Sequence, residues 1–405
     1  MAVASRSAST DPAGLQDAVH HLASIHRPSA SAGEREAAEW IAERLRALGA
    51  DARIEEERAH GGYWWPLGLL AGAGAIAGVL ARRGGLWRVP GGLLAGVAAH
   101  GIADDVGGGR LWFRRRFLPH RPTYNVVAEA GDRDATRTVV LVGHHDAAHT
   151  SLLFDPRAGR ALNGIPWVLE HVDSTPPLMF PVFGGPALVA LGSLLGDRGA
   201  VTLGTLLSAA TAATMAEIGS RPVVPGANDN LTGVATLLGV AHALQTRPLE
   251  GLRVLLVSTG SEESFMEGMQ AFARRHFGEL DPRRTHVVCV DTVGSPELVL
   301  LAGEGMLLMR EYPADFSDLV AACAQDEAVP LRRGMRLRNA TDGLIALKAG
   351  YPTVMLGSVN ELKLPDNYHW PTDTAENVDY STVLDAVKLC DAVVRRLAAR
   401  AVGSG

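Results

Sequence analysis

Four long segments without charged residues constrain the fold of this chain more than any other feature. No Asp, Glu, Lys or Arg occurs at positions 61–81, 89–103, 174–196 or 199–216. A helix that crosses a membrane needs about 20 apolar residues, and three of these segments approach that length while 89–103 is short. Because the segments lie in two adjacent pairs, each pair predicts an apolar helical hairpin.

A membrane is the environment that such hairpins fit best. Trp64 and Trp65 begin the first segment, where the aromatic belt at a membrane surface would lie. The alternative is that helices rich in Ala and Gly pack against the rest of the protein or form an apolar dimer face, but four of them are difficult to bury in 405 residues. We therefore expect a multi-pass membrane protein in contact with a lipid bilayer. Arginines lie on both sides of the first hairpin, so its orientation stays open.

Composition excludes several other classes of protein. The chain is 47% apolar and 20% charged, which excludes disorder of the whole chain. Its 38 basic and 44 acidic residues leave no basic surplus for binding nucleic acid. Cys289, Cys323 and Cys390 form no CxxC pair and predict neither a disulfide framework nor a thiol metal site. The Ser- and Ala-rich residues 1–12 are expected to form a loose tail.

The rest of the chain alternates between strand-like and helix-like segments. Apolar runs predict strands at 53–57, 124–128, 138–142, 253–258, 286–290, 298–301 and 353–356. Helical spacing predicts helices at 15–25, 34–48, 231–244, 265–275, 317–325, 342–348 and 381–399. Such alternation predicts an α/β fold, with a mostly parallel central sheet flanked by helices. We assign this domain to 13–60, 118–173 and 218–400, with 61–117 and 174–217 as inserted apolar helical hairpins.

Polar residues gather where the predicted strands end. The strand at 138–142 leads into Gly143, His144, His145 and Asp146. Ligands of open parallel sheets bind beyond the carboxyl ends of the strands. At such a place His144 would bind a metal through one ring nitrogen while Asp146 holds the other. On its own, a His-x-Asp string is more often a chance pair in a loop.

Four further strings strengthen this interpretation. Asp229 opens an apolar helix, where a carboxylate either caps the helix or bridges two cations. Glu262 and Glu263 follow a strand, and one can bind a metal while its neighbour acts as a base. Asp291 ends the next strand, and His369 lies in a polar loop. Each has an ordinary reading as a cap or loop residue, but together they predict a site for two divalent ions, with zinc the first candidate.

In this order, the strings resemble those of the co-catalytic zinc aminopeptidases, metallopeptidase family twenty-eight. That family includes bacterial leucyl aminopeptidases, with glutaminyl cyclases as single-zinc relatives. The matching strings are GHHDA, GANDNLTG, STGSEES, VCVDTVG and YHWPTDTAENVD. The resemblance covers 15–58, 123–148 and 225–397. It implies a zinc exopeptidase fold and an enzyme that releases N-terminal residues from peptides.

The resemblance also implies how the metal ligands are divided. His144, Asp229 and Asp291 would hold one ion. Asp229, Glu263 and His369 would hold the other, so that Asp229 bridges the pair.

Catalytic roles follow from the same resemblance. Glu262 would be the general base that acts on the water between the ions. Asp146 would orient His144. Tyr368 stands where some members place a phenol that stabilises the oxyanion, and Asp373 would support the ligand histidine beside it.

The chain departs from the family in two respects. Between Asp146 and Asp229 lie 83 positions, far more than the family usually needs, and the second apolar pair occupies them. The string Asn339–Gly343 keeps an acidic residue, Asp342, but lacks the His of many relatives, which leaves the specificity pocket open. His145 and His149 are expected to be bystanders.

Three other functions remain in competition. The first is a single-zinc acyltransferase like glutaminyl cyclase, a branch that lacks the first ligand histidine, whereas His144 is present here. The second is a zinc carboxypeptidase or deacylase, which normally inserts a dimerisation domain before the last histidine; only 78 positions separate Asp291 from His369. The third is a catalytically dead membrane scaffold, which would have lost ligands. The oligomeric state and the preferred N-terminal residue stay open.

Overall fold

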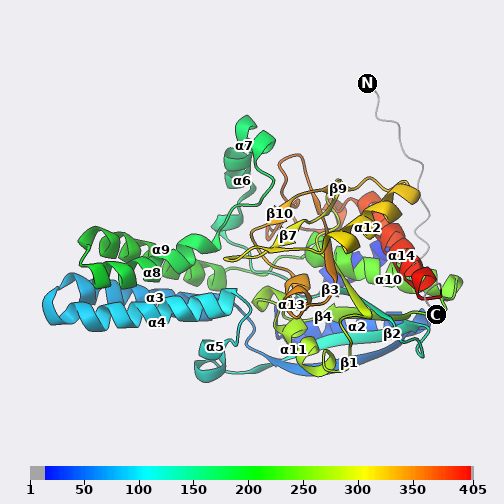
Figure 1. Ribbon diagram of the computed structural model, residues 1–405, viewed down its shortest axis with the longest axis horizontal. Coiled ribbons are helices and arrows are strands. Elements are labelled where there is room, and N and C mark those ends of the chain that lie inside the picture. Colours follow the sequence, from blue (N-terminus) through cyan, green and yellow to red (C-terminus); the bar gives the residue numbers. More distant parts are fainter. Residues whose placement is uncertain (1–13, 403–405) are drawn as a thin grey trace.

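The computed structural model describes residues 14–402, so the tail expected at 1–12 lies outside the described residues. Its centre is an eight-stranded sheet with the order β1-β2-β4-β3-β5-β11-β6-β9 (Figure 1). Its strands are β1 (Asp51–Ala59), β2 (Arg121–Gly131), β3 (Thr138–His144), β4 (Arg253–Thr259), β5 (Thr285–Val290), β6 (Glu297–Leu300), β9 (Arg332–Arg333) and β11 (Thr353–Val359). A small second sheet contains β7 (Gly303–Glu304), β8 (Arg310–Glu311) and β10 (Arg336–Leu337).

The middle of the large sheet is parallel and its margins are mixed. Strand β3 pairs in parallel with both β4 and β5, and β5 pairs in parallel with β11. Pairs β1–β2, β2–β4 and β6–β11 are antiparallel, so the sheet as a whole is mixed and the predicted parallel arrangement describes its centre. Every residue of β3 is buried, which is why its sequence is an unbroken apolar run rather than an alternating one.

Helices cover both faces of the sheet. One face packs on α1 (Leu15–Ala23), α2 (Ala32–Ala47), α10 (Thr232–Thr246), α12 (Ala314–Asp326) and α14 (Tyr380–Val402). The other packs on α11 (Glu267–His276), α13 (Asp342–Lys348) and the near ends of the two apolar hairpins. Seven predicted helices therefore exist, with boundaries shifted by a few residues.

The four apolar segments form a bundle that projects from one end of the globular part (Figure 1). Its helices are α3 (Trp64–Arg82), α4 (Arg88–Val106), α8 (Met179–Leu195) and α9 (Arg198–Ser220), and the turn between α3 and α4 contains η1 (Gly85–Trp87). Helix α3 packs against α4 and α9, and α8 packs against the same two. The uncharged stretch at 89–103 is short, but the helix that contains it continues to Val106 and has 19 residues.

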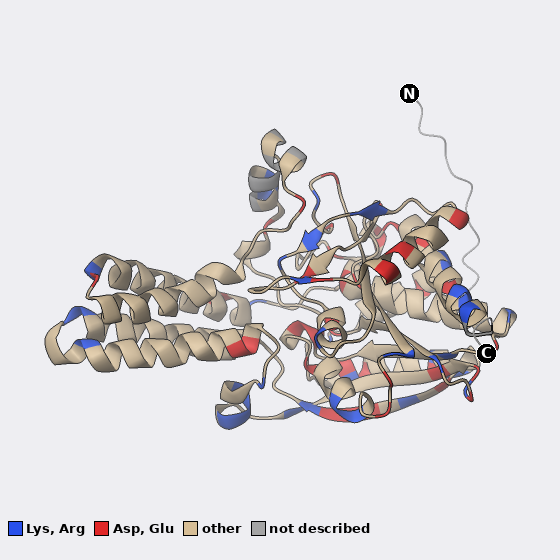
Figure 2. Ribbon diagram, in the orientation of Figure 1, with Lys and Arg blue, Asp and Glu red and all other residues tan. Residues whose placement is uncertain are grey.

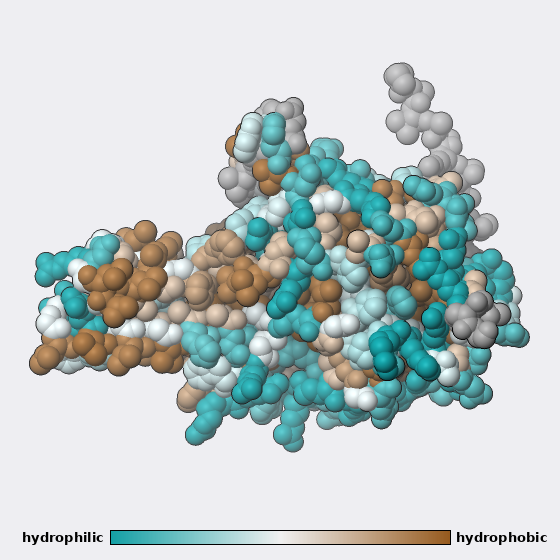
Figure 3. Space-filling model, in the orientation of Figure 1, coloured by the Kyte–Doolittle hydropathy of each residue, from teal (hydrophilic) through white to brown (hydrophobic). Residues whose placement is uncertain are grey.

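Small residues fill the interior of this bundle and large apolar ones cover its surface. A Cβ on Gly78 would lie 1.9 Å from Thr205 Oγ1, and one on Gly204 would lie 2.6 Å from a backbone oxygen of α8. Leu, Ile, Val and Trp side chains point outward, including Ile76, which is 62% exposed, and Leu194, which is 75% exposed. Charges are confined to the tip and root of the bundle (Figure 2), and its side is largely apolar (Figure 3).

Several short elements were not predicted from the sequence. They are α5 (Trp112–Phe117), η2 (Leu152–Phe154), α6 (Pro156–Asn163), α7 (Pro166–His171), η3 (Ala227–Leu231), η4 (Glu262–Ser264) and η5 (Ala375–Asn377). They are too short for apolar periodicity to identify them. Four of them, α5, η2, η3 and η4, carry residues of the candidate site or of its supports.

Candidate active site

The carboxyl ends of the central parallel strands bring the predicted residues together. His144 is the last residue of β3 and lies opposite Thr259, the last residue of β4. Glu262 and Glu263 follow β4 in η4, and Asp291 directly follows β5. Asp229 lies in η3, where the backbone leaves helical geometry just before α10 begins.

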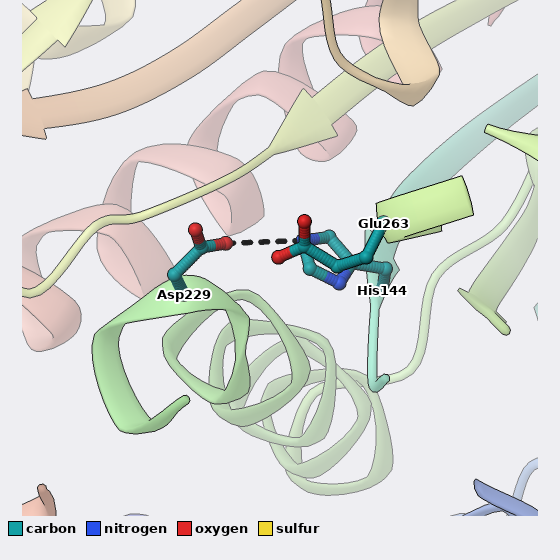
Figure 4. Close-up of side chains that lie close together, drawn as sticks. All are labelled: His144, Asp229 and Glu263. Atoms are coloured by element: carbon teal, nitrogen blue, oxygen red, sulfur yellow. Dashed lines mark ion pairs between the residues drawn. The ribbon is translucent and has the colours of Figure 1, made fainter. Parts of the chain in front are cut away.

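All five predicted metal ligands are buried and face one another. Figure 4 shows His144, Asp229 and Glu263 converging from three different elements. Nitrogen or oxygen atoms of these three residues lie within 4.8 Å of one another. Their burial is not accidental, because a side chain of this polarity rarely enters a core without a partner or a ligand.

Asp229 lies between the two histidines. Its Oδ1 is 3.2 Å from Nε2 of His144, and its Oδ2 is 3.2 Å from Nε2 of His369. One carboxylate therefore presents one oxygen to each histidine, which is the geometry of a bridging group.

The remaining acids divide between the same two histidines. On one side, His144 Nε2 is 3.9 Å from Asp291 Oδ2 and 3.9 Å from Glu262 Oε2. On the other, His369 Nε2 is 3.3 Å from Glu263 Oε1. Asp291 and Glu262 thus lie on the His144 side of Asp229, and Glu263 lies on the His369 side.

Asp146 contacts more of the site than His144, the residue that it was expected to orient. Its Oδ1 is 3.4 Å from His144 Nδ1, and the same carboxylate accepts backbone hydrogen bonds from Glu262 and Glu263 at 3.0 and 3.2 Å. Ser29 donates a further hydrogen bond of 2.6 Å to it. Asp146 thus holds the histidine and both glutamates in one arrangement.

The loop that carries the two glutamates has a strained backbone. Ser261, Phe265 and Met266 all have positive φ angles, a region that non-glycine residues seldom adopt. Gly260 permits a close approach, because a Cβ there would lie 2.6 Å from Glu34 Oε1. Tertiary contacts must hold such a conformation in place.

One of the residues that make these contacts is Glu34, whose role was not identified from the sequence. Glu34 accepts hydrogen bonds from the backbone of Ala30, Tyr124 and Ser261, so it ties α2 to β2 and the catalytic loop. Ser31 caps α2 by accepting a hydrogen bond from the backbone of Glu34, but the Glu34 side chain points to this loop instead of completing a capping box. No local spacing distinguishes this role from a helix cap.

A buried ionic network holds the far side of the same loop. Arg114 of α5 is fully buried and binds Asp105 of α4 at 2.6 Å. Its Nη1 donates to the Ser264 carbonyl oxygen at 2.8 Å and lies 3.3 Å from Glu267. His60, in turn, lies 2.6 Å from Glu267. The network links the root of the bundle to the residues directly after Glu263.

Two further buried residues, Asp373 and Arg27, hold the η3 segment that carries Asp229. Asp373 accepts backbone hydrogen bonds from Asn228 and Asp229 rather than contacting His369, the role expected for it. Arg27, which the sequence analysis missed, is fully buried and donates to the carbonyl oxygens of His145 and Gly226. Burial lowers the pKa of Arg27 to about 10, against the raising effect of Asp373.

Aromatic side chains form one wall of the site. The ring of Tyr368 stacks on His369 with centroids 3.9 Å apart, and Phe154 packs edge-on against both rings. The Tyr368 hydroxyl accepts a hydrogen bond of 2.9 Å from Asn339 Nδ2. Burial raises the pKa of Tyr368 well above its ordinary value, so the phenol keeps its proton.

The buried groups of the cluster shift one another's pKa values. Burial raises the pKa of Glu262 and Asp291 well above ordinary carboxyl values. Burial opposes protonation of His369, but Glu263 and Asp229 outweigh it and raise its pKa to about 10. Cations bound among these groups would take the place of the protons.

The other polar residues named from the sequence have different surroundings. His145 is buried against Ser258, and burial lowers its pKa to about 3. His149 contacts the backbone of Arg221 and the ring of Trp64. Asp342 accepts a hydrogen bond from Thr259, and burial raises its pKa to about 7.

Comparisons with known proteins show similarity to one family of peptidases. Residues 209–394 match the sequence profile of peptidase family M28. No curated protein sequence matches the chain.

Solved structures extend the similarity to most of the chain. An aminopeptidase from Aneurinibacillus sp. strain AM-1 is 14% identical, with a TM-score of 0.55 and coverage of 95% of this chain and 93% of that one. A Zn-dependent exopeptidase from Parabacteroides distasonis is 12% identical, with a TM-score of 0.55 and coverage of 94% and 97%. A glutaminyl cyclase from Bacteroides thetaiotaomicron is 13% identical, with a TM-score of 0.55 and coverage of 94% and 96%. The predicted resemblance to peptidase family M28 is therefore confirmed, by sequence over residues 209–394 and by the zinc exopeptidase fold over most of the chain.

Proposed function

We propose that this protein is a metal-dependent aminopeptidase that removes N-terminal residues from peptides. The observation that carries the proposal is the placement of Asp229, with one carboxylate oxygen 3.2 Å from each of two histidine nitrogens. A bridging carboxylate between two His and acid groups is the arrangement that a pair of divalent cations requires.

The donors fit such a pair. We assign His144 and Asp291 to one ion, Glu263 and His369 to the other, and Asp229 to both. Glu263 Oε1 is buried and accepts no hydrogen bond from the described part of the chain, so it has a free lone pair for a ligand. When bound, two ions, with zinc the best match for these N and O donors, would acidify a shared water and polarise the scissile carbonyl.

The chain's own residues supply the proton transfers. Glu262 takes the proton of the attacking water at its carboxylate and delivers it to the leaving amine. Asp146 keeps Glu262 in place by accepting the hydrogen bond of its backbone N–H. The Tyr368 hydroxyl, which accepts a hydrogen bond from Asn339, has its own proton free to donate to the developing oxyanion. The free peptide N-terminus would lie beside the carboxylates, which favours an exopeptidase.

The test is substrate profiling of the full chain extracted in detergent, with metal analysis. We expect cleavage of aminoacyl and free N-terminal peptide substrates, none of N-acetylated ones, loss on chelation and recovery with Zn2+ or Co2+. Two ions per chain are expected. One ion per chain with pyroglutamate formed from N-terminal Gln would assign the glutaminyl cyclase reaction instead, and activity that survives chelation would exclude both.

We also propose that the bundle spans a membrane, as an insertion of 61–117 and 174–217 into a peptidase domain made of 13–60, 118–173 and 218–400. Helices α3 and α9 are long and apolar enough to cross a bilayer, and only 44% and 28% of their apolar windows are buried. The core helix of a soluble protein would be mostly buried. The outward Leu, Ile and Val side chains supply the lipid-facing surface.

Membrane fractionation tests this placement. The native protein should stay in the membrane pellet after washing with alkaline carbonate and enter the supernatant only with detergent. Release by carbonate alone would instead favour an apolar dimer face, which gel filtration of the released protein would reveal.

A further inference from the structure

A basic pocket lies next to the root of the bundle, between β1, α5 and α11. Its volume is about 220 Å³. Arg58 at the end of β1, Arg115 of α5 and Arg274 of α11 line it, together with His60 and His120. Four separate segments of the chain therefore contribute a cationic or imidazole group to one small space.

The pocket holds more positive charge than the chain neutralises. None of Arg58, Arg115 and Arg274 forms an ion pair with a carboxylate among residues 14–402. Glu267 is the one acidic side chain in the lining, and it is already bound by Arg114 and His60. Like charges held together in this way repel one another unless an anion joins them.

His60, which lines the pocket, also has an unsatisfied polar atom. The residue is 8% exposed, and its Nδ1 lies 2.6 Å from Glu267 Oε1. Its Nε2 is buried and has no hydrogen-bond partner in the described part of the chain. That nitrogen would donate to an anion as imidazolium, or accept from a protonated phosphate oxygen as neutral imidazole. Buried polar atoms without partners are uncommon and call for a ligand.

We propose that this pocket binds a phosphate group. Arginine forks and an imidazole suit a compact anion with several oxygens, and the volume admits a phosphate rather than a folded chain. The source that the surroundings favour is a phospholipid headgroup. Helix α5 lies at the root of the bundle (Figure 1), and its Phe117 is 62% exposed, so aromatic and basic side chains occur together where headgroups would lie.

The phosphate chemistry of this proposal does not depend on peptidase activity. Only the lipid source depends on the proposed membrane position. Free phosphate in solution is the other source of the same chemistry, and the experiment separates the two.

The experiment compares two double variants of the full chain in detergent, stripped of metal by chelation so that phosphate cannot bind at the metal ligands. Arg115→Ala with Arg274→Ala removes two pocket charges. The matched control is Arg116→Ala with Arg275→Ala, which removes two charges from the same two helices; Arg275 pairs with Glu57 at 2.8 Å and does not line the pocket. Calorimetric titration with inorganic phosphate should detect one site per chain, weakened about tenfold or more in the pocket variant and unchanged in the control.

Mixed micelles identify the source. If micelles doped with phosphatidic acid displace phosphate and phosphatidylcholine micelles do not, the ligand is an anionic headgroup. If neither lipid displaces phosphate, the pocket takes the free ion and the membrane assignment of the ligand is wrong. The proposal is overturned if the unaltered protein binds no phosphate and no phosphatidic acid, or if the control variant loses binding as much as the pocket variant does.

Discussion

At the scale of single residues, the site depends on acids that look alike in sequence and have different neighbours. Asp229 contacts two histidines, whereas Asp146 accepts backbone hydrogen bonds from both glutamates of the loop after β4. Glu262 and Glu263 are adjacent in the chain, but only Glu263 lies beside His369. Environment rather than residue type therefore separates the roles proposed for these acids: bridge, positioning group, base and ligand.

This separation predicts different losses for two conservative substitutions. Glu262→Gln should lower kcat by a factor of about 10² to 10⁴ and leave the metal content unchanged, because it removes a proton acceptor and no ligand. Asp229→Asn should lower both kcat and the metal content, because it weakens the carboxylate proposed to bind both ions. Metal analysis and steady-state kinetics of the same preparations check this; full activity in Glu262→Gln would exclude Glu262 as the base.

A second residue-scale prediction concerns the pH dependence of stability. Burial alone would raise the pKa of Glu267, but Arg114 and His60 outweigh it and lower the pKa from 4.5 to about 2. Folding thus favours the ionised form, and this stabilisation is present above pH 4.5 and is lost as the pH falls toward 2. This shift contributes on the order of 3 kcal/mol to the free energy of unfolding.

Tryptophan fluorescence can follow this loss during unfolding. The difference in free energy of unfolding between the protein and Glu267→Gln should be largest above about pH 5 and shrink steadily in acid. A difference that stays constant with pH would mean that Glu267 is not ionised in the folded protein.

At the scale of elements, the loop after β4 and the bundle are mechanically joined. Arg114 in α5 contacts Asp105 of α4, the Ser264 carbonyl and Glu267. Removing a fully buried guanidinium leaves Asp105 without its ion-pair partner and Glu267 with only His60 and Ser264, a large penalty. The strained loop with Glu262 and Glu263 depends on that support.

Arg114 is accordingly expected to be a positioning residue. Arg114→Ala should destabilise the protein by about 3 to 5 kcal/mol and lower kcat more than it raises KM. Arg114→Lys should recover part of the stability, because it restores the charge without the two-pronged contact to Asp105. If Arg114→Ala unfolds, the kinetics of the Lys variant still decide: an unchanged kcat there would contradict the positioning role.

Helix packing in the bundle gives a prediction with an internal control. A Cβ on Gly78 would meet Thr205 Oγ1 at 1.9 Å, whereas one on Gly72 of the same helix meets nothing within 4 Å. Gly78→Ala should destabilise the bundle by about 1 to 3 kcal/mol through overpacking, and Gly72→Ala should be neutral or stabilising. Thermal unfolding in detergent checks both, and equal effects would argue against the close packing of α3 on α9.

At the scale of the whole molecule, the two hairpins share one tip, far from the globular part (Figure 1). The α3–α4 turn contains Leu86, which is 91% exposed, and Gly84 lies near Arg198 at the start of α9. Both hairpins enter and leave the bundle at its root, where they join the globular part. A membrane around it would leave the globular part on one side and only the tip on the other.

Thiol labelling tests this topology. Cys289, Cys323 and Cys390 are all buried, so the background reaction with an impermeant reagent should be low. A cysteine at Leu86 should react only from the membrane side opposite to that of a cysteine at Gly278, whose surroundings are open. If both introduced cysteines react from the same side, the bundle does not span the membrane.

The sequence by itself determined the type of most elements and which polar residues gather at one edge of the sheet. Apolar runs in β3, β4 and β5 predict buried strands because both of their faces are covered, and polar residues after such strands predict a ligand site because parallel strands end at one edge. Two hairpins could be predicted because charge is absent over whole helices. These are local patterns, and each can be read without knowing its neighbours.

Only the tertiary structure decided which residues support that site. Arg27, Glu34 and Arg114 act through partners far from them in the chain, and their spacing resembles that of helix caps and surface charges. The antiparallel margins of the sheet and the pairing of the two hairpins into one bundle are long-range choices of the same kind. Each of these arrangements depends on contacts between residues far apart in the chain, and no local pattern records which partner a residue will meet.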